Sequence, residues 1–385
     1  MDNILVGYKK MVNIRAKARS LFLVVITCFS YSKAACADSV LVGYWGYNEF
    51  LAKYPEEKKL TSSLKDMVEM DPIPLAIKQD KPVKISFIYP GEQASDYWKR
   101  NLITLESRLK SLNIKYELTP VSTRLNVDFK EQSSSLYDAI EKKYDYLIFT
   151  LNTTRHRKFI EHVIQSPDTK IIVQNITTPV KAWDDNQPLL YVGFDHVIGT
   201  KLLADYYQNR FPNGAKYGML YFSYGYLSTA RGDVFVQSMD NNKYTLRSSF
   251  YTEATKSSAY TATKNILQHT CNVDFIYASS TDIALGALDA INQNTKYRPI
   301  INGWGGGTLE LNAIKNGTLD VTVMRMNDDT GIAMAEAIKL DLEGEKVPTV
   351  FSGDFEVITS DTPIDKIEKL EKKAFRYSGV DLEHE

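Results

Sequence analysis

The sequence predicts an α/β fold with two doubly wound parallel-sheet lobes and a ligand cleft between them. From Lys84 onward, apolar runs of five to eight residues alternate with amphipathic stretches, the pattern of strands and helices in turn. Runs such as 146–151 are apolar on both faces, as strands are when helices cover both sides of a parallel sheet. Ten such strands exceed one ordinary sheet of about five or six, which favours two sheets.

Each expected element follows from a local pattern. The helix expected over Asp96 to Leu112 carries leucines at three- and four-residue spacing, which place them on one face. Helices of this kind fit between the strands. The expected strands are Lys84–Tyr89, Lys115–Thr119, Tyr144–Leu151, Lys170–Asn175, Leu189–Phe194, Tyr217–Ser223, Tyr244–Tyr251, Val273–Ser279, Ile300–Gly303 and Leu319–Arg325.

The amino terminus has the order of a secretory signal peptide. Basic residues precede the apolar run Leu21–Ile26, and small residues around Ala37 follow it. The apolar run is far shorter than the roughly 20 residues that a membrane-spanning helix needs. We therefore expect residues 1–37 to be a signal peptide for export to the periplasm, with no direct membrane insertion.

Three further regions are expected after the signal peptide. Residues 38–83 form an N-terminal extension and linker. The N-terminal lobe takes residues 84–194 plus 327–346, and the C-terminal lobe takes residues 195–326 plus 347–385.

Charge and composition exclude several function classes. The 385 residues carry a formal net charge of -1 with no polybasic arm, so no nucleic-acid partner is expected. The five histidines lie outside zinc and nucleophile motifs, so neither a metal site nor a catalytic site is expected. Of these histidines, only His196 lies near a strand end. The Gly305–Gly307 turn lacks the lysine of a phosphate loop, so no nucleotide cofactor is implied.

Polar and aromatic side chains gather at the carboxyl ends of the expected strands, where ligands of such sheets bind. Amides, hydroxyls and a carboxylate suit the hydroxyl groups of a ligand, and indoles stack on a small ring. Ser95 and Asp282 can equally be helix caps. The candidate set is Gln93, Ser95, Trp98, Asn175, Thr281, Asp282 and Trp304.

Two arginines change the expected ligand. Arg325 stands in an apolar strand, where an unpaired buried charge is costly unless an anion or strong acceptors meet it. With Arg231 beside it and only Asp282 opposite, the site favours a small oxygen-rich anion. The alternatives are an ion pair of Arg231 with Asp233 or Asp240, and of Arg325 with Asp328 or Asp329.

Several segments resemble known receptors. The segment 321–329, followed by 331–333 and later by 344–348, resembles the hinge strand and final crossover of periplasmic binding proteins of the ribose-binding type. From about Gly43 to Ser378 the chain is similar, more closely, to the autoinducer-2 receptors of Vibrio-type bacteria. The segments that carry this resemblance are 43–47, 95–98, 149–151 with 153–159, 174–179 and 302–307.

The resemblance implies a type I periplasmic binding protein, whose two lobes are joined by three crossing segments, and not an enzyme. It implies a receptor for autoinducer-2 as a furanosyl borate diester, with borate as part of the ligand and no separate cofactor. Arg231 and Arg325 match the arginines that meet the borate, and the other seven candidates match the remaining contacts. The implied partner is the periplasmic domain of a LuxQ-like membrane sensor histidine kinase in quorum sensing.

A transport function remains open from the residues alone. A sugar or sugar-acid receptor of an importer needs the same cleft, and the identity of the ligand separates the two functions.

Overall fold

The computed structural model describes residues 40–124, 126–270, 272–294 and 297–380. The expected signal peptide over residues 1–37 lies outside this part of the chain. Within the described residues, no helix has both the length and the apolar character needed to cross a membrane.

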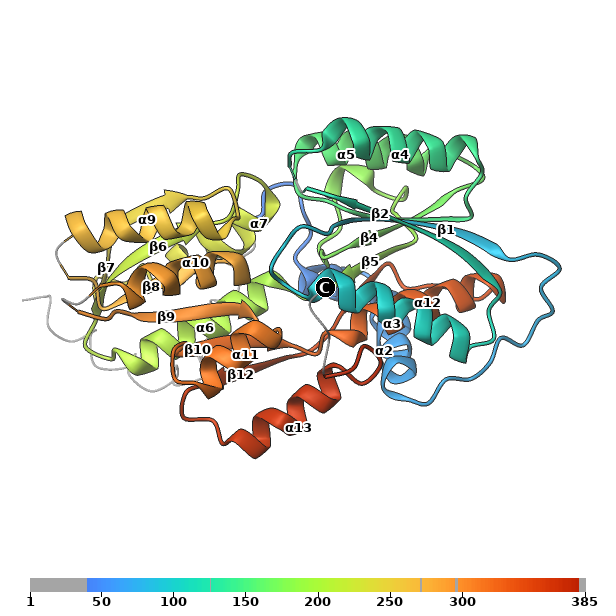
Figure 1. The fold of residues 1–385 in the computed structure, drawn as a ribbon. Helices are drawn as coiled ribbons and strands as arrows, with labels where there is room; N and C mark the ends of the chain where they lie inside the picture. Colours follow the sequence, from blue (N-terminus) through green and yellow to red (C-terminus); the bar gives the residue numbers. More distant parts are fainter. Residues whose placement is uncertain (1–39, 125, 271, 295–296, 381–385) are drawn as a thin grey trace, which may run out of the picture. The chain divides into compact units, whose positions relative to one another are not determined.

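Six parallel strands form the sheet of the first lobe, in the order β11-β5-β4-β3-β1-β2. Helices α4 (Phe129–Glu141) and α5 (Thr154–Ile164) cover one face, and α3 (Tyr97–Ser111) and α12 (Asp328–Leu342) cover the other (Figure 1). The strands are β1 (Val83–Pro90), β2 (Tyr116–Thr123), β3 (Tyr146–Thr150), β4 (Lys170–Gln174), β5 (Leu190–Gly193) and β11 (Val350–Ser352).

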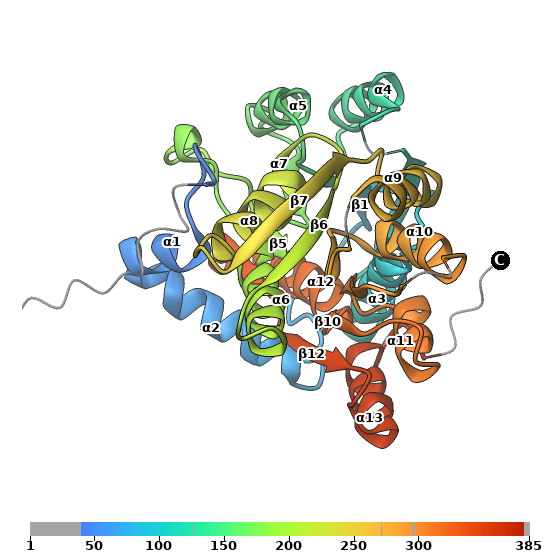
Figure 2. The same cartoon turned by 90° about the vertical axis from the view of Figure 1, so that its left-hand side faces the viewer.

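The second lobe has its own six-stranded sheet, in the order β12-β10-β9-β8-β6-β7, with only β12 antiparallel to its neighbour. Figure 2 shows α6 and α8 on one face of β6 and β7, with α9 and α10 on the other. The strands are β6 (Ala215–Tyr221), β7 (Tyr244–Tyr251), β8 (Phe275–Ala278), β9 (Ile300–Gly305), β10 (Val321–Arg325) and β12 (Phe355–Thr359). The helical segments are α6 (His196–Arg210), α7 (Tyr226–Ser228), η2 (Thr229–Asp233), α8 (Val234–Ser238), α9 (Lys256–His269), α10 (Thr281–Asn292), α11 (Thr308–Lys315) and α13 (Ile364–Ala374).

The N-terminal extension packs on the first lobe through α1 (Tyr47–Lys53) and α2 (Pro55–Glu69). Leu64 of α2 is fully buried in the core that α3 and α12 share. The Thr61 hydroxyl donates to the Val350 carbonyl at 2.9 Å, which ties α2 to the edge strand β11. The short 3-10 turn η1 (Lys181–Trp183) completes this lobe.

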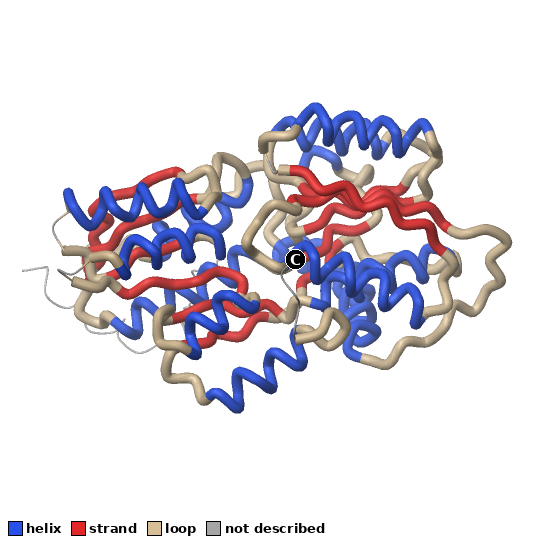
Figure 3. Tube along the Cα trace, viewed as in Figure 1, coloured by secondary structure: helices blue, strands red, loops and turns tan. Residues whose placement is uncertain are grey.

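The alternation of strands and helices (Figure 3) matches the predicted α/β class, and all ten expected strands are present. The leucine stripe of the first long helix is confirmed, since Leu105 and Leu109 are fully buried. The sequence pattern missed β11 and β12: β11 has only three residues, and β12 is an edge strand with mostly half-buried or exposed side chains rather than a continuous apolar run. The expected C-terminal lobe was therefore wrong in two places: residues 350–352 belong to the first sheet, and the chain after α13 packs on the first lobe.

Three segments connect the two sheets, after β5, after β10 and after β11, and hydrogen bonds join these segments to one another. The Gly353 amide donates to the Gly193 carbonyl at 2.9 Å, and the Met326 amide donates to the Asp354 carbonyl at 3.0 Å. After α13 the chain returns to the first lobe, where the amides of Tyr377 and Ser378 donate to Asp328 at 2.7 and 2.9 Å. A change in lobe angle must therefore bend a bonded group of segments.

Candidate functional site

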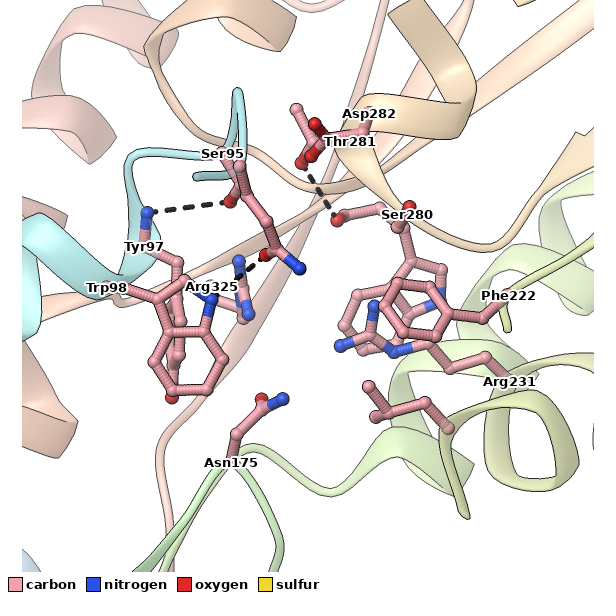
Figure 4. A pocket seen from close by; sticks show the side chains of 13 residues that line it. Ser95, Tyr97, Trp98, Asn175, Phe222, Arg231, Ser280, Thr281, Asp282 and Arg325 are labelled. Carbon is pink, nitrogen blue, oxygen red and sulfur yellow. Dashed lines mark hydrogen bonds between the residues drawn. The ribbon is translucent and has the colours of Figure 1, made fainter. Parts of the chain in front are cut away.

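All nine predicted site residues line one pocket between the lobes (Figure 4). We call this the cleft pocket. Four further side chains complete its wall. The lining residues are Gln93, Ser95, Tyr97, Trp98, Asn175, Phe222, Leu227, Arg231, Ser280, Thr281, Asp282, Trp304 and Arg325.

The wall from the first lobe is the loop between β1 and α3. The indole nitrogen of Trp98 donates to Gln93 Oε1 at 2.9 Å, which fixes the amide and turns its nitrogen away from the indole. Ser95 Oγ accepts from the Tyr97 amide at 3.5 Å, a long contact, and Asp96 occupies the N-cap position of α3. Helix capping therefore uses little of the hydrogen-bonding capacity of the Ser95 hydroxyl, which faces the cleft pocket.

Asn175 follows β4 and adopts a left-handed backbone conformation with φ of 61°. Asparagine is one of the few residues that tolerate this region. The turn brings the Asn175 side chain to the cleft pocket, where Oδ1 is buried without a hydrogen-bonding partner among the described residues. An unmet buried acceptor is costly, so a ligand donor at this point would be favoured.

Arg231 lies in η2, a π-helical turn between α7 and α8. Such turns are rare and often mark functional sites. Its guanidinium carbon lies 3.7 Å from the centroid of the Trp304 ring, and Nη1 donates to the Ser279 carbonyl at 3.0 Å. Burial, reinforced by the Arg325 charge, lowers the pKa of Arg231 to about 9, so the side chain stays charged at neutral pH.

Arg325 is the last residue of β10 and is 5% exposed. Its guanidinium carbon lies 4.0 Å from the Tyr97 ring centroid, and Nε has no hydrogen-bonding partner in the described chain. Gly305 has φ of 137°, and a Cβ there would come within 2.6 Å of Arg325 Nη2. Glycine is therefore required for the arginine to pack against this turn.

No ion pair within the described residues joins either arginine to a carboxylate. The alternative interpretation of Arg325 is wrong, because Asp329 pairs with Arg376 at 2.8 Å and Asp328 accepts from the C-terminal segment. Arg231 forms no pair with Asp233 or Asp240. Burial lowers the pKa of Arg325 as well, since the opposing effects of Tyr97, Glu310 and Asp96 only partly offset the lost hydration.

Asp282 of the second lobe contacts the first lobe directly. Ser280, not Asp282, is the N-cap of α10, so the capping interpretation of Asp282 is wrong. Asp282 Oδ1 instead accepts from the Ala94 amide across the cleft at 2.8 Å. Burial raises the pKa of Asp282 against the opposing effect of this bond. The neighbouring Thr281 hydroxyl contacts the Trp304 carbonyl at 3.4 Å.

Glu310 is a site residue that the sequence pattern did not reveal. It is fully buried behind Trp304, and its two oxygens accept from the Trp304 amide at 3.0 Å and the Gly306 amide at 2.8 Å. The Thr322 hydroxyl also donates to it. Glu310 therefore fixes the turn that carries Trp304, and a glutamate in the first turn of a helix gave no sign of this from the sequence.

Replacing Glu310 by glutamine is expected to destabilise the protein by about 1–3 kcal/mol, because an amide NH2 would face a buried donor. The Trp304 environment should change with it. Urea unfolding and tryptophan fluorescence measure both effects, with Glu368→Gln on the exposed surface of α13 as the matched control. Equal behaviour of the two variants would show that the bonds to Glu310 do not support the turn.

The remaining lining residues were adjacent to those predicted. Tyr97 and Ser280 each precede a predicted residue in the chain, and their hydroxyl groups were an available signal. Phe222 and Leu227 belong to the segment after β6, where only Arg231 has a distinctive side chain. Among the described residues, no cluster of three histidine, cysteine or carboxylate side chains could hold a metal ion.

The cleft pocket thus combines two guanidinium groups, one carboxylate with a raised pKa, amides, hydroxyls and indoles. Its net charge is positive and its walls come from both lobes. Such an arrangement suits the binding of a small polar molecule between two α/β lobes. The chain belongs to the periplasmic binding protein domain family, whose model matches residues 85–346.

Several curated relatives are ribose import binding proteins. The chain is 26% identical to RbsB of Salmonella typhimurium over 169 residues, covering 44% of this chain and 57% of that protein. It is 24% identical to RbsB of Bacillus subtilis over 232 residues, covering 60% of this chain and 74% of that protein. The chain thus spans little more than half the length of the Salmonella protein.

Solved structures share the fold at low identity. The chain resembles a protein of the XylFII-LytSN complex with a TM-score of 0.62 and 19% identity, over 73% of this chain and 99% of that one. It resembles a periplasmic solute binding protein of Actinobacillus succinogenes with bound D-allose, with a TM-score of 0.64 and 18% identity, over 75% of this chain and 100% of that one. Both confirm two parallel-sheet lobes.

Proposed function

We propose that this chain is an exported periplasmic receptor of the LuxP type, which binds autoinducer-2 as a furanosyl borate diester. One observation carries the proposal: Arg231 and Arg325 are both buried at the cleft pocket and neither has a carboxylate partner among the described residues. Burial of two such charges is costly without an anion. A tetrahedral borate ester supplies one negative charge and oxygen acceptors to both guanidinium groups.

The other side chains suit the remainder of such a ligand. Gln93, Ser95, Asn175 and Thr281 offer hydrogen-bonding groups to ring hydroxyls, and Asp282 accepts from them. The indoles of Trp98 and Trp304 provide apolar walls for a small ring. The ligand is bound and released unchanged, so the receptor is not an enzyme.

Binding is coupled to lobe closure, because contacts to the ligand come from both lobes. A ligand that meets Gln93 and Asn175 on one side and Arg231 on the other stabilises the closed population. The proposed reader of this change is the periplasmic domain of a LuxQ-like membrane sensor histidine kinase. The XylFII-LytSN complex supports this to the extent that a chain of similar fold assembles with a second protein.

A sugar or sugar-acid receptor of an importer is the second candidate. The RbsB relatives are ribose import binding proteins, and one protein of similar structure has D-allose bound. A neutral sugar would use the amides and indoles but would leave two guanidinium charges without an anion. The two buried arginines therefore favour the signalling receptor over the transport receptor.

Titration of the purified chain with the autoinducer-2 precursor, with and without borate, tests the proposal through tryptophan fluorescence. Borate-dependent binding is expected, and Arg231→Ala should weaken it at least tenfold, since a charged hydrogen bond contributes about 1.5–3 kcal/mol. Arg247→Ala, on an exposed strand surface, is the matched control. Binding of ribose without borate would instead support transport, and slow consumption of ligand would indicate an enzyme.

A further inference from the structure

His196 lies behind the cleft pocket and touches both of its walls. It is the first residue of α6, directly after the first crossing segment, and is 1% exposed. Its Nε2 lies 2.9 Å from the Asn175 carbonyl oxygen, and its Nδ1 lies 3.4 Å from Arg231 Nε. Asn175 belongs to the first lobe and Arg231 to the second.

The two partners determine the tautomer of the ring. The Asn175 carbonyl oxygen can only accept a hydrogen bond, so Nε2 must carry the proton that is donated to it. Arg231 Nε can only donate, so Nδ1 must present its lone pair. Both contacts form only when the imidazole is neutral with its hydrogen on Nε2.

We propose that His196, as the neutral Nε2–H tautomer, is a positioning residue that holds Asn175 and Arg231 in register for the ligand. The inference rests on the proposed function of the cleft pocket, since its effect on affinity needs a ligand there. The ring itself is fixed by packing, with its centroid 5.3 Å from Trp304 and 6.0 Å from Tyr226. His196 does not line the cleft pocket, so it acts through its two neighbours.

The position of His196 gives this role a mechanical consequence. The Asn175 backbone is in the left-handed region, and the bond from Nε2 supports the carbonyl of this turn. The Arg231 guanidinium donates to His196 Nδ1 on one side and to the Ser279 carbonyl on the other, and these two bonds orient it. One rigid ring next to a crossing segment therefore couples the two walls as the lobes close.

The charges that face His196 keep its ring neutral. Arg231 on η2 and Arg325 on β10 are both cations that act on His196, and the Tyr226 ring on α7 packs against the imidazole. Burial, followed by the Arg231 charge, holds the pKa of His196 well below its ordinary value of 6.5. A lowered pKa means that the neutral form persists from pH 8 to below pH 6.5, so ligand affinity should not fall across that interval through this residue.

Two substitutions separate the two contacts of His196, and a third removes both. His196→Asn places an acceptor near Nδ1 and keeps the Arg231 contact, while His196→Gln reaches the Asn175 carbonyl and keeps that contact. Each should weaken binding of the autoinducer-2 precursor with borate about tenfold, because a displaced Asn175 or Arg231 loses about one hydrogen bond to the ligand. His196→Phe keeps the aromatic packing but loses both contacts, so it should weaken binding about a hundredfold.

Nitrogen-15 NMR of the ligand-free wild-type protein tests the tautomer without any ligand. The expected spectrum shows His196 with a protonated Nε2 and a bare Nδ1, unchanged from pH 8 to pH 6. A hydrogen on Nδ1, or titration near pH 6.5, would overturn the inference even if the ligand binds. Failure of the wild-type protein to bind the ligand would count against the proposed function only, because the NMR result stands apart from it. Wild-type affinity in His196→Phe would also overturn the positioning role.

Discussion

Replacement of Arg325 by methionine is expected to abolish tight binding of an anionic ligand while the ligand-free protein keeps its stability or gains some. Arg325 is 5% exposed and has no ion pair in the described chain, so methionine of similar length removes a desolvated charge. Replacing buried charges by apolar side chains is often neutral or stabilising by about 1–4 kcal/mol. Loss of a buried charged contact to a ligand costs about 2–5 kcal/mol of affinity.

Calorimetric titration and thermal unfolding measure the two effects on the same sample. Arg247→Met, on the exposed face of β7, is the control for loss of an arginine as such. Arg325→Lys adds a second test, because an ammonium keeps the charge but not the planar fork that meets two oxygens at once. A drop in melting temperature for Arg325→Met as large as the loss of binding would make Arg325 a structural residue instead.

The sequence predicted the strands and the ligand-facing residues because both leave local signals. A strand buried on two faces is a continuous apolar run, and an arginine inside such a run is conspicuous, as Arg325 was. Asn175 and Thr281 were found by their position after a strand. All nine predicted residues do lie at one pocket, though whether they contact a ligand remains a prediction.

The residues that hold the site in place could not be predicted, because their partners are distant in the chain. Glu310 looks like an ordinary first-turn carboxylate, and only the fold turns it toward the amides of Trp304 and Gly306. His196 has partners 21 and 35 residues away. The short edge strand β11 was not predicted for a related reason, since three residues show no periodicity and its pairing with β5 is nonlocal.

A second group of nonlocal contacts joins the lobes beside the cleft pocket. Asp96 Oδ2 accepts from Arg100 Nε at 2.7 Å and, across the cleft, from the Thr308 amide and hydroxyl at 3.1 and 2.9 Å. Arg100 also donates to the Thr308 hydroxyl at 2.8 Å and to the Gly379 carbonyl at 2.6 Å. A Cβ at Gly307 would come within 2.2 Å of Asp96, so this approach requires glycine. This junction of Asp96, Arg100 and Thr308 therefore joins the two lobes and the returning C-terminal segment.

Replacing Asp96 by alanine is expected to destabilise the protein by about 3–5 kcal/mol, because Arg100 is fully buried and would lose its counter-ion. Burial raises the pKa of Asp96, but the Arg100 charge and its hydrogen bond outweigh this, so the pKa lies below the ordinary value of 3.8. A depressed carboxyl pKa stabilises the fold above pH 3.8, and this contribution is lost as the pH falls through the native value. Urea unfolding at pH 7 and pH 3 should show a smaller gap between wild type and Asp96→Ala at the lower pH.

Thr308→Val tests closure rather than folding, because it removes only the hydroxyl that bridges Asp96 and Arg100 across the cleft. In an open form water can replace that hydroxyl, so the ligand-free stability should change by less than about 0.5 kcal/mol, as for most substitutions outside special features. The closed form alone loses bonds with a net value of about 1 kcal/mol, which lowers ligand affinity roughly fivefold. Small-angle scattering of the ligand-free variant should give a larger radius of gyration than wild type. If Thr308→Val instead destabilises the fold as much as Asp96→Ala, the junction is part of the core at every lobe angle and closure does not depend on it.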